Sequence, residues 1–337
     1  MSLTSSFPSV ALAHKPTPLE LLTNISNETG VNIWVKRDDC TGLAFGGNKA
    51  RQLEYYIGQA VAEGADLLLT TGAVQSNHVR CTVAAARKLG LDVEVQLEHR
   101  VDTQSHAYHH SGNPFIVELM GATVHHFPVG EDENAADDAL YLRAETLRSN
   151  GRKPYVIPLA NAHAPWGALG YVEAAEELLA QQRSMQLSPA AWVVASGSAS
   201  THAGLLVGLA ACEADIALYG ICVRRPADAQ KARVWNKIKS VTKLFESIQP
   251  PRQDQVQCDD RAFAPGYGVM SESVRQTLLR LARSDGMILD PTYTAKSFAG
   301  LLGLIDDGTL APGSDVVYVH TGGTPAVFAY PEILTGS

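Results

Sequence analysis

Short apolar stretches rich in β-branched residues alternate with amphipathic helical stretches from Val31 onward. In the first half of the chain we expect helices at 48–63, 77–89, 113–120 and 133–149, and strands at 32–36, 66–71, 93–97, 123–127 and 155–158. This alternation is typical of βα units, which build a mainly parallel sheet with helices on its faces. The sequence therefore predicts an α/β fold.

The second half of the chain repeats the pattern after a helix at 167–182. We expect strands at 191–195, 216–223 and 315–320, a closing helix after Gly323, and further helices at 201–212, 227–242, 271–284 and 293–306. The segment 249–257 contains two prolines and several polar residues, and is the clearest loop. A chain of 337 residues is long enough for two domains or one large α/β domain, and its first half looks like a compact sub-domain.

Composition argues against several functional classes. The formal net charge of -8 leaves no basic excess to bind a phosphate backbone, so we expect no nucleic-acid partner. No apolar run approaches the roughly 20 residues that span a bilayer. Residues 1–10 lack the basic and apolar regions of a secretory signal. We therefore expect a cytoplasmic protein with no membrane partner.

Neither the cysteines nor the histidines indicate a metal site. The five cysteines are an odd number without CxxC spacing, which argues against a zinc ribbon or a disulfide framework. His106, His109 and His110 are close in sequence, and His125-His126 end a predicted strand. Ligation needs convergent geometry that spacing alone does not provide. We expect no metal, and histidines that face solvent or a substrate loop.

A lysine follows the first of three Gly/Ser/Thr-rich turns, in Gly46-Gly47-Asn48-Lys49. Such turns at the carboxyl ends of strands are where ligands bind in open α/β sheets. The start of a helix and partial burial both disfavour the ammonium form of Lys49, which favours imine formation. Taken alone, the tetrapeptide favours a surface lysine beside a turn.

The second turn, 71–78, ends a strand and begins a helix. Ser76 or Asn77 can be an ordinary helix N-cap, or both can bind a ligand. His78 can be a base or a packed residue. The sequence leaves these alternatives open.

The third turn, 195–201, follows an apolar strand and leads into a helix, so that its backbone N–H groups and hydroxyls can hold a phosphate. It lacks the spacing of a Walker loop, and no GxGxxG follows a strand, so ATP and NAD are poorly supported. The alternative is a small-residue turn without a ligand. Tyr267 and Tyr293 lie at later turns, and the strand end 320–324 offers a further hydroxyl.

Together these segments resemble the fold-type II pyridoxal 5′-phosphate (PLP) enzymes, the tryptophan synthase β family. Within that family they are similar to the branch of D-cysteine desulfhydrase, 1-aminocyclopropane-1-carboxylate (ACC) deaminase and L-cysteate sulfo-lyase. The resemblance extends from Thr17 to Tyr330 and is carried by Lys36-Arg37-Asp38-Asp39, Gly46-Gly47-Asn48-Lys49, Gln75-Ser76-Asn77-His78, Gly167-Ala168-Leu169-Gly170-Tyr171, Ser196 to Thr201 and His320-Thr321-Gly322-Gly323.

This resemblance implies a two-domain tryptophan synthase β-like α/β fold, in which each domain is a mainly parallel sheet flanked by helices. The larger, PLP-binding domain would comprise 1–47 and 160–337, and the smaller domain 48–159, with the active site in the cleft between them. A homodimer is also implied.

The resemblance further assigns roles to individual residues. Lys49 would carry PLP, Asn77 would contact the ring hydroxyl, and Thr294 or Thr321 would face the ring nitrogen. The phosphate would be held by Gly197, Ser198, Ala199, Ser200 and Thr201. The implied catalytic residues are Lys49, Ser76, Tyr267 and Tyr293. An amino-acid substrate would contact Ser76, Asn77, His78, His163 and Tyr267.

The implied reaction is the β-elimination and deamination of a three-carbon amino acid of the cysteine or cysteate type, giving pyruvate, ammonia and sulfide or sulfite. In ACC deaminases a glutamate follows the tyrosine, whereas Thr294 follows Tyr293 here. A hydroxyl partner leaves the ring nitrogen largely unprotonated, which favours expulsion of a good β-leaving group over opening of a cyclopropane. The alternatives are an ACC deaminase, giving 2-oxobutyrate and ammonia, and a non-catalytic PLP-binding protein.

The segment 159–166 departs from its relatives, which are similar to Gly-Gly-Ser-Asn at this place. Leu159 and Ala160 restrict the backbone, and His163 and Trp166 add bulk and a possible charge. Either the substrate differs from free D-cysteine, or these side chains pack beneath the loop. For a substrate with a sulfonate or a second carboxylate, the cationic candidates are His109, His110, His163 and Arg80.

Overall fold

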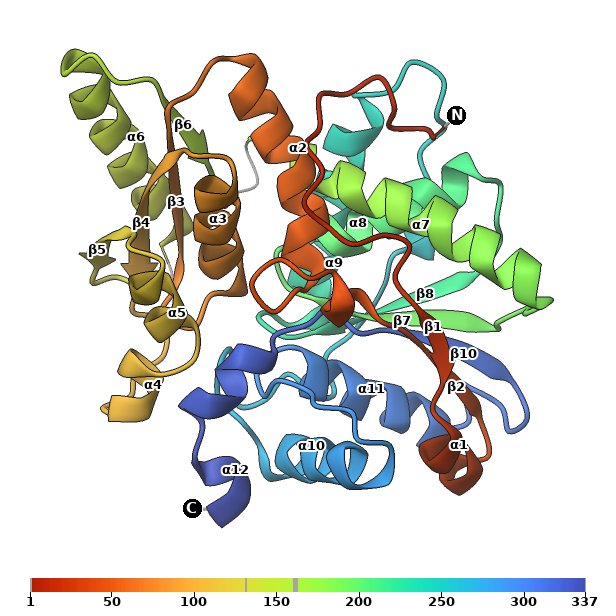
Figure 1. Ribbon diagram of the computed structural model, residues 1–337. Coiled ribbons are helices and arrows are strands. Elements are labelled where there is room, and N and C mark those ends of the chain that lie inside the picture. Colours follow the sequence, from red (N-terminus) through yellow and green to blue (C-terminus); the bar gives the residue numbers. More distant parts are fainter. Residues whose placement is uncertain (1, 131, 160–162, 337) are drawn as a thin grey trace.

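The computed structural model describes residues 2–130, 132–159 and 163–336, and contains two β-sheets (Figure 1). Neighbouring strands of the six-stranded sheet are β1 (Leu19–Leu21), β2 (Asn32–Lys36), β10 (Asp315–Val319), β7 (Ala191–Ser196), β8 (Ala217–Cys222) and β9 (Gln257–Asp259). Only the β1–β2 pairing is antiparallel. The smaller sheet is parallel throughout, in the order β5 (Thr123–Phe127), β4 (Asp92–Glu98), β3 (Leu67–Ala73) and β6 (Pro154–Ile157).

Helices cover both faces of the larger sheet, as Figure 1 shows. On one face lie α7 (Trp166–Met185), α8 (Ser200–Ala211) and α9 (Ala227–Thr242), and on the other α1 (Thr23–Thr29), α10 (Glu272–Ser284) and α11 (Thr294–Asp306). Successive strand residues point to opposite faces, so Trp192 packs in the α7–α8–α9 core and Val193 in the α10–α11 core. Strands buried on both faces read as continuous apolar runs, which is why the sequence pattern reveals them.

The smaller sheet is covered in the same way. The helices α2 (Asn48–Ala62), α3 (Asn77–Lys88) and α5 (Asn113–Leu119) share one apolar core with Leu68, whereas α6 (Glu133–Ser149) shares the opposite core with Leu67 and Leu69. Short helices α4 (His106–His110) and α12 (Glu332–Thr335) complete the set, with 3-10 turns η1 (Asp38–Cys40), η2 (Gln253–Gln255) and η3 (Thr324–Ala329).

The predicted α/β class with mainly parallel sheets is confirmed. The elements β1, α1, α4 and β9, all of which are short, were not predicted. After Gly323, where a closing helix was predicted, the chain forms the 3-10 turn η3 and then the short helix α12, and the predicted loop 249–257 contains η2. All strands of the smaller sheet lie within the predicted domain 48–159. The domain limits themselves stay a prediction, and Ala160 lies outside the described residues. No helix in the described part of the chain is long and apolar enough to cross a membrane.

A buried ion network fixes the first turn of α2. The Arg51 guanidinium donates to both carboxylate oxygens of Asp38, at 3.0 Å each, and to both oxygens of Glu177 on α7, at 2.9 Å each. Arg51 and Asp38 are almost completely buried. The Tyr171 hydroxyl donates to Asp38 at 2.6 Å, so the remaining acceptor capacity of the carboxylate is also used. The network joins η1, α2 and α7.

We predict that Arg51→Met lowers the free energy of unfolding by about 3–5 kcal/mol, because it leaves Asp38 as a buried charge without its guanidinium partner. Urea unfolding followed by circular dichroism measures the change. The exposed Arg252 provides a matched control, since Arg252→Met removes only a surface ion pair with Asp254 and should have a small effect. Equal unfolding midpoints for the two variants would contradict the prediction.

Candidate active site

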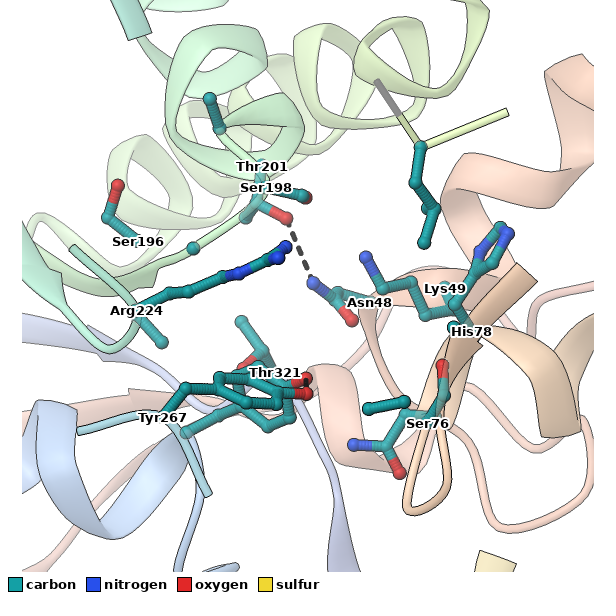
Figure 2. Close-up of a pocket in the computed structure, with 18 of the residues that line it drawn as sticks. Asn48, Lys49, Ser76, His78, Ser196, Ser198, Thr201, Arg224, Tyr267 and Thr321 are labelled. Atoms are coloured by element: carbon teal, nitrogen blue, oxygen red, sulfur yellow. Dashed lines mark hydrogen bonds between the residues drawn. The ribbon is translucent and has the colours of Figure 1, made fainter. Parts of the chain in front are cut away.

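One cavity collects the turns that follow several strands (Figure 2). Its lining comes from the start of α2, the β3–α3 turn, the β7–α8 turn, and loops that contribute Tyr267, Tyr293 and Thr321. The turns lie at the carboxyl ends of parallel strands, where α/β folds bind their ligands. The structure thus brings together all three turns singled out in the sequence.

Two glycine-containing segments cross beside Lys49. A Cβ atom on Gly322 would lie 2.5 Å from the Cα atom of Gly47, and the N–H of Asn48 donates to the carbonyl oxygen of Thr321 at 2.9 Å. Gly46 has a φ of 65°, and a Cβ there would meet the Asp39 carbonyl oxygen at 2.1 Å. Only glycine permits this approach, which places Lys49 on the cavity wall.

The amine of Lys49 is primed for nucleophilic chemistry. Its Nζ donates to Oε1 of Gln52 at 3.1 Å, one turn along α2. Burial of the amine lowers the pKa of Lys49 to about 8, because the ammonium form loses its hydration. A substantial fraction of the amine is therefore neutral near physiological pH, as attack on a carbonyl requires.

The β7–α8 turn forms a cup at the start of α8, which we name the anion cup because its groups are suited to hold an anion. Gly197, Ser198, Ala199 and Thr201 line the cavity, and Ala199 adopts a left-handed conformation with a φ of 77° as α8 begins. The Thr201 hydroxyl oxygen accepts hydrogen bonds from the Asn48 and Gln52 amides, both at 2.9 Å. Its own proton is therefore available to a ligand. Together with the helix N-terminus, these groups suit a phosphate.

The side chain of Asn77 is oriented by two neighbours. Its Oδ1 accepts from Arg80 Nη1 at 2.8 Å and from the Asn113 amide at 3.1 Å, which leaves the Asn77 NH2 group as the donor that can serve a ligand. Arg80 also donates to the carbonyl oxygen of Gly46 at 2.7 Å. Arg80 therefore holds Asn77 and the Lys49 segment in place, and is not a cation of the cavity.

Ser76 and His78 both line the cavity, and each also has a local structural partner. Ser76 is the N-cap of α3 and accepts a hydrogen bond from the Val79 N–H at 3.2 Å. Ser76 is therefore both a helix N-cap and a residue of the cavity wall. The His78 Nε2 lies 2.9 Å from the Thr70 hydroxyl. Burial, with a contribution from the Lys49 charge, lowers the pKa of His78 to about 3, so its imidazole stays neutral in the working range.

Two tyrosines close the opposite side. The hydroxyl oxygens of Tyr267 and Tyr293 lie 2.5 Å apart, and both residues line the cavity. Burial raises the pKa of Tyr293 above its usual range, so that this phenol stays protonated. Thr321 also lines the cavity, next to the Gly47 crossing. The pair and Thr321 thus face Lys49 across one space, as Figure 2 shows for Tyr267 and Thr321.

The prediction that Thr294 contacts a cofactor ring is not supported by the structure. Thr294 is completely buried, and its hydroxyl donates to Oδ1 of Asp290 at 2.7 Å and accepts from the Asp290 N–H at 2.6 Å. It does not belong to the described residues that line the cavity. The reason is local, since Asp290 caps the start of α11 and engages the hydroxyl. Thr321, the other residue predicted for the ring nitrogen, lines the cavity.

Two further predicted residues lie off the cavity wall formed by the described residues. His163 contacts Asp137 at 3.2 Å and the Tyr141 hydroxyl at 3.2 Å, so it packs on α6, and its contact with a substrate stays a prediction. Ser200 is the first residue of α8, beneath the cup. From the divergent segment 159–166, Leu159 lines the cavity, whereas Ala160 and its next two neighbours lie outside the described residues.

Sequence analysis missed three charged residues of the lining, Arg100, Glu133 and Arg224. Arg100 and Arg224 each come two residues after a strand, β4 and β8, so the strand-end rule applied to all residue types would have found them. Of the cationic candidates named above, His109 instead contacts the Thr103 carbonyl oxygen at 2.9 Å. Within the described ranges, no group of three or more His, Cys, Asp or Glu is arranged to hold a metal.

We predict that in the ligand-free enzyme Lys49 reacts with an amine-directed acetylating reagent at half its maximal rate near pH 8, below the value of about 10.4 for an unperturbed lysine. The reactive neutral form grows as pH rises through the pKa, so the rate should increase from pH 6 and level off above pH 9. Peptide mass spectrometry measures the rate, with the exposed Lys243 as internal comparison. A profile for Lys49 that coincides with that of Lys243 would contradict the prediction.

Comparisons with known proteins agree with this geometry. The sequence profile of the pyridoxal-phosphate dependent enzyme family matches residues 10–322. The chain is 41% identical over 324 residues, 96% of both chains, to D-cysteine desulfhydrases from Salmonella paratyphi C and Salmonella choleraesuis. A solved structure described as an ACC deaminase homologue superposes with a TM-score of 0.86 at 36% identity, covering 99% of this chain and 97% of the other.

More distant structures share the fold. Diaminopropionate ammonia lyase from Escherichia coli matches with a TM-score of 0.65 at 18% identity, covering 95% of this chain and 86% of its own. The profile and the full-length relatives together show that the chain belongs to the pyridoxal-phosphate dependent enzymes of fold type II.

Proposed function

We propose that this enzyme catalyses β-elimination from a three-carbon, β-substituted amino acid, releasing pyruvate and ammonia, and that it acts as a carbon–sulfur lyase. The single observation that carries the proposal is the Lys49 amine with its lowered pKa, which shares one cavity with the anion cup and the tyrosine pair. The 41% identity to D-cysteine desulfhydrases over 96% of the chain supports the same reaction class.

The residues present fit PLP. Lys49 would bind the aldehyde carbon of PLP, and the turn from Gly197 to Thr201 would hold its phosphate. The Asn77 amide would donate a hydrogen bond to the oxygen on the PLP ring, and Thr321 would face the ring nitrogen. When bound, PLP withdraws electrons from the substrate α-carbon and so makes its proton removable. A hydroxyl such as that of Thr321 at the ring nitrogen would leave PLP a weaker electron sink than a carboxylate would, which still suffices to expel a good leaving group.

The side chains around Lys49 divide the remaining work. Once released, the Lys49 amine accepts the α-proton, since its lowered pKa keeps a neutral fraction available. The Ser76 hydroxyl and the N-terminus of α3 receive the substrate carboxylate. The Tyr267–Tyr293 pair, with one phenol donating to the other, can supply a proton on the side of the leaving group. The neutral His78 adds no charge beside the amine.

We predict that Lys49→Ala abolishes pyruvate release and the visible absorbance of the bound cofactor together, because both depend on the same amine. The assay measures pyruvate from D-cysteine, L-cysteine, L-cysteate, β-chloroalanine and D-serine, and 2-oxobutyrate from ACC. The exposed Lys243→Ala is the matched control. A visible lysine-bound band in Lys49→Ala after dialysis would disprove the assignment of Lys49.

The same panel tests the alternatives. Release of 2-oxobutyrate from ACC, without pyruvate from the other compounds, would identify an ACC deaminase. A yellow protein that yields no keto acid from any member would be a non-catalytic PLP-binding protein. The retained lining of Ser76, Tyr267 and Tyr293 argues against this second alternative, because a cofactor store needs no substrate-side groups.

A cytoplasmic homodimer is the assembly we expect. Large apolar side chains are exposed in two segments of the chain. One segment contains Phe115 and Leu119 on α5, and the other contains Phe328 and Leu334 near the C-terminus. Apolar exposure of this kind is common where subunits associate. Sedimentation equilibrium would distinguish a dimer from a monomer.

A further inference from the structure

Two guanidinium groups line the cavity beside the tyrosine pair. Arg100 lies two residues beyond β4 of the smaller sheet, and Arg224 two residues beyond β8 of the larger sheet. Their side chains are only 5% and 6% exposed. Figure 2 shows Arg224 extending into the cavity from the wall opposite Lys49. Neither residue has a role in holding PLP or in moving the α-proton as proposed above.

Arg100 is held rigidly by a buried carboxylate. Its Nε and Nη2 donate to the two oxygens of Glu98, at 2.8 and 2.9 Å, and Glu98 also accepts from the Thr71 hydroxyl at 2.8 Å. The ion pair does not involve Nη1 of Arg100. A guanidinium fixed in this way presents its remaining donors in a set direction, which suits recognition of a planar or tetrahedral anion.

Arg224 is held from the other side of the cavity by Glu133, the first residue of α6. The Glu133 carboxylate is shared by Arg224, Arg225 and Arg233. Burial acts to raise the pKa of Glu133, but the three arginines outweigh it and keep the carboxyl ionised. Glu133 therefore positions Arg224 by a strong ionic contact.

The consecutive residues Arg224 and Arg225 contact different parts of the cavity wall. Arg225 donates to the carbonyl oxygen of Gly197 at 3.2 Å and so supports the phosphate cup. Arg224 instead lies over the Tyr267 ring, with its central carbon 5.7 Å from the ring centroid. Tyr267 in turn contacts Tyr293, and Arg224 therefore lies beside the tyrosine pair that we assign to the leaving group.

We infer that Arg100 and Arg224 form a subsite for a sulfonate group on the β-carbon of the substrate. The inference rests on the proposed β-elimination and narrows its substrate class. Buried guanidinium groups bind an anion strongly, whereas a neutral thiol offers them little. The α-carboxylate is received separately, at the start of α3, so the two acidic groups of the substrate bind at different ends.

For a sulfonate substrate the chemistry balances. The α-proton is removed, the Cβ–S bond breaks with its electron pair on sulfur, and the sulfonate leaves as sulfite. Water then converts the three-carbon residue to pyruvate and ammonium, so that cysteate and one water give pyruvate, ammonium and bisulfite. The arginines bind the negative charge of the sulfonate as the electron pair moves onto it.

The experiment compares holoenzymes carrying Arg224→Gln, Arg100→Gln or the conservative Arg224→Lys with the unmodified enzyme. We expect each glutamine variant to lower kcat/KM for cysteate by about 100-fold, because a buried charge contact is lost, with no comparable change for neutral β-chloroalanine. Arg224→Lys should recover part of the loss. The exposed Arg252→Gln serves as the control and should behave like the unmodified enzyme.

A binding measurement adds a readout that does not depend on turnover. Calorimetry with 3-sulfopropionate, which has no amino group to react, should give binding to the unmodified enzyme that is weakened in the glutamine variants, whereas propionate should bind poorly to all. This comparison also works in the unmodified enzyme alone, should a variant fail to fold.

The outcomes separate the two proposals. If no member of the panel yields pyruvate, the proposed elimination fails. If β-chloroalanine is turned over and the glutamine variants affect it as strongly as cysteate, the elimination stands and the acidic subsite is wrong. A loss of PLP affinity in Arg224→Gln, measured by fluorescence titration, with the cysteate preference unchanged, would assign Arg224 to the phosphate and also overturn the inference.

Discussion

The buried contact of Arg51 with Asp38 and Glu177 determines where the reactive lysine points. Lys49 and Arg51 are two residues apart on α2, and residues at that spacing do not share a helix face. While Arg51 is bound to the carboxylates of Asp38 and Glu177, the first turn of α2 cannot rotate, and Lys49 stays on the cavity wall. An uncompensated guanidinium in this interior would be costly, so the orientation is strongly specified.

The reactivity of Lys49 follows from the same packing. The crossing of Gly47 and Gly322 brings two chain segments together without side chains between them, and this closes one side of the lysine. Desolvation then lowers its pKa, while the Gln52 amide holds the amine and also bonds Thr201 of the anion cup. The position of Lys49, its protonation and the anion cup are thus coupled through the first turns of α2.

Much of this was predictable from the sequence, for a physical reason. Small and hydroxyl residues after buried strands are local signals, and the turns that contain Lys49, Ser76 and Thr201 do line one cavity. Thr294 lies off the described cavity wall because its hydroxyl bonds Asp290, four residues earlier, a contact that competes with a ligand. Arg100 and Arg224 follow strands but do not stand in Gly/Ser/Thr-rich turns, and the direction of the Arg224 side chain depends on a tertiary partner. Glu133, the partner of Arg224, lies 91 residues away in sequence.

The residues proposed for the elimination chemistry and the residues proposed for substrate selectivity come from different parts of the structure. The groups that would serve PLP come from short turns, which the sequence shows as motifs. The groups that would read the β-substituent are held by Glu98 and Glu133, from a strand and a helix of the smaller sheet. A site that presents charged donors to one part of a substrate discriminates against analogues that leave those donors unpaired. One fold can therefore keep its elimination chemistry constant while strand-end arginines select which leaving group is accepted.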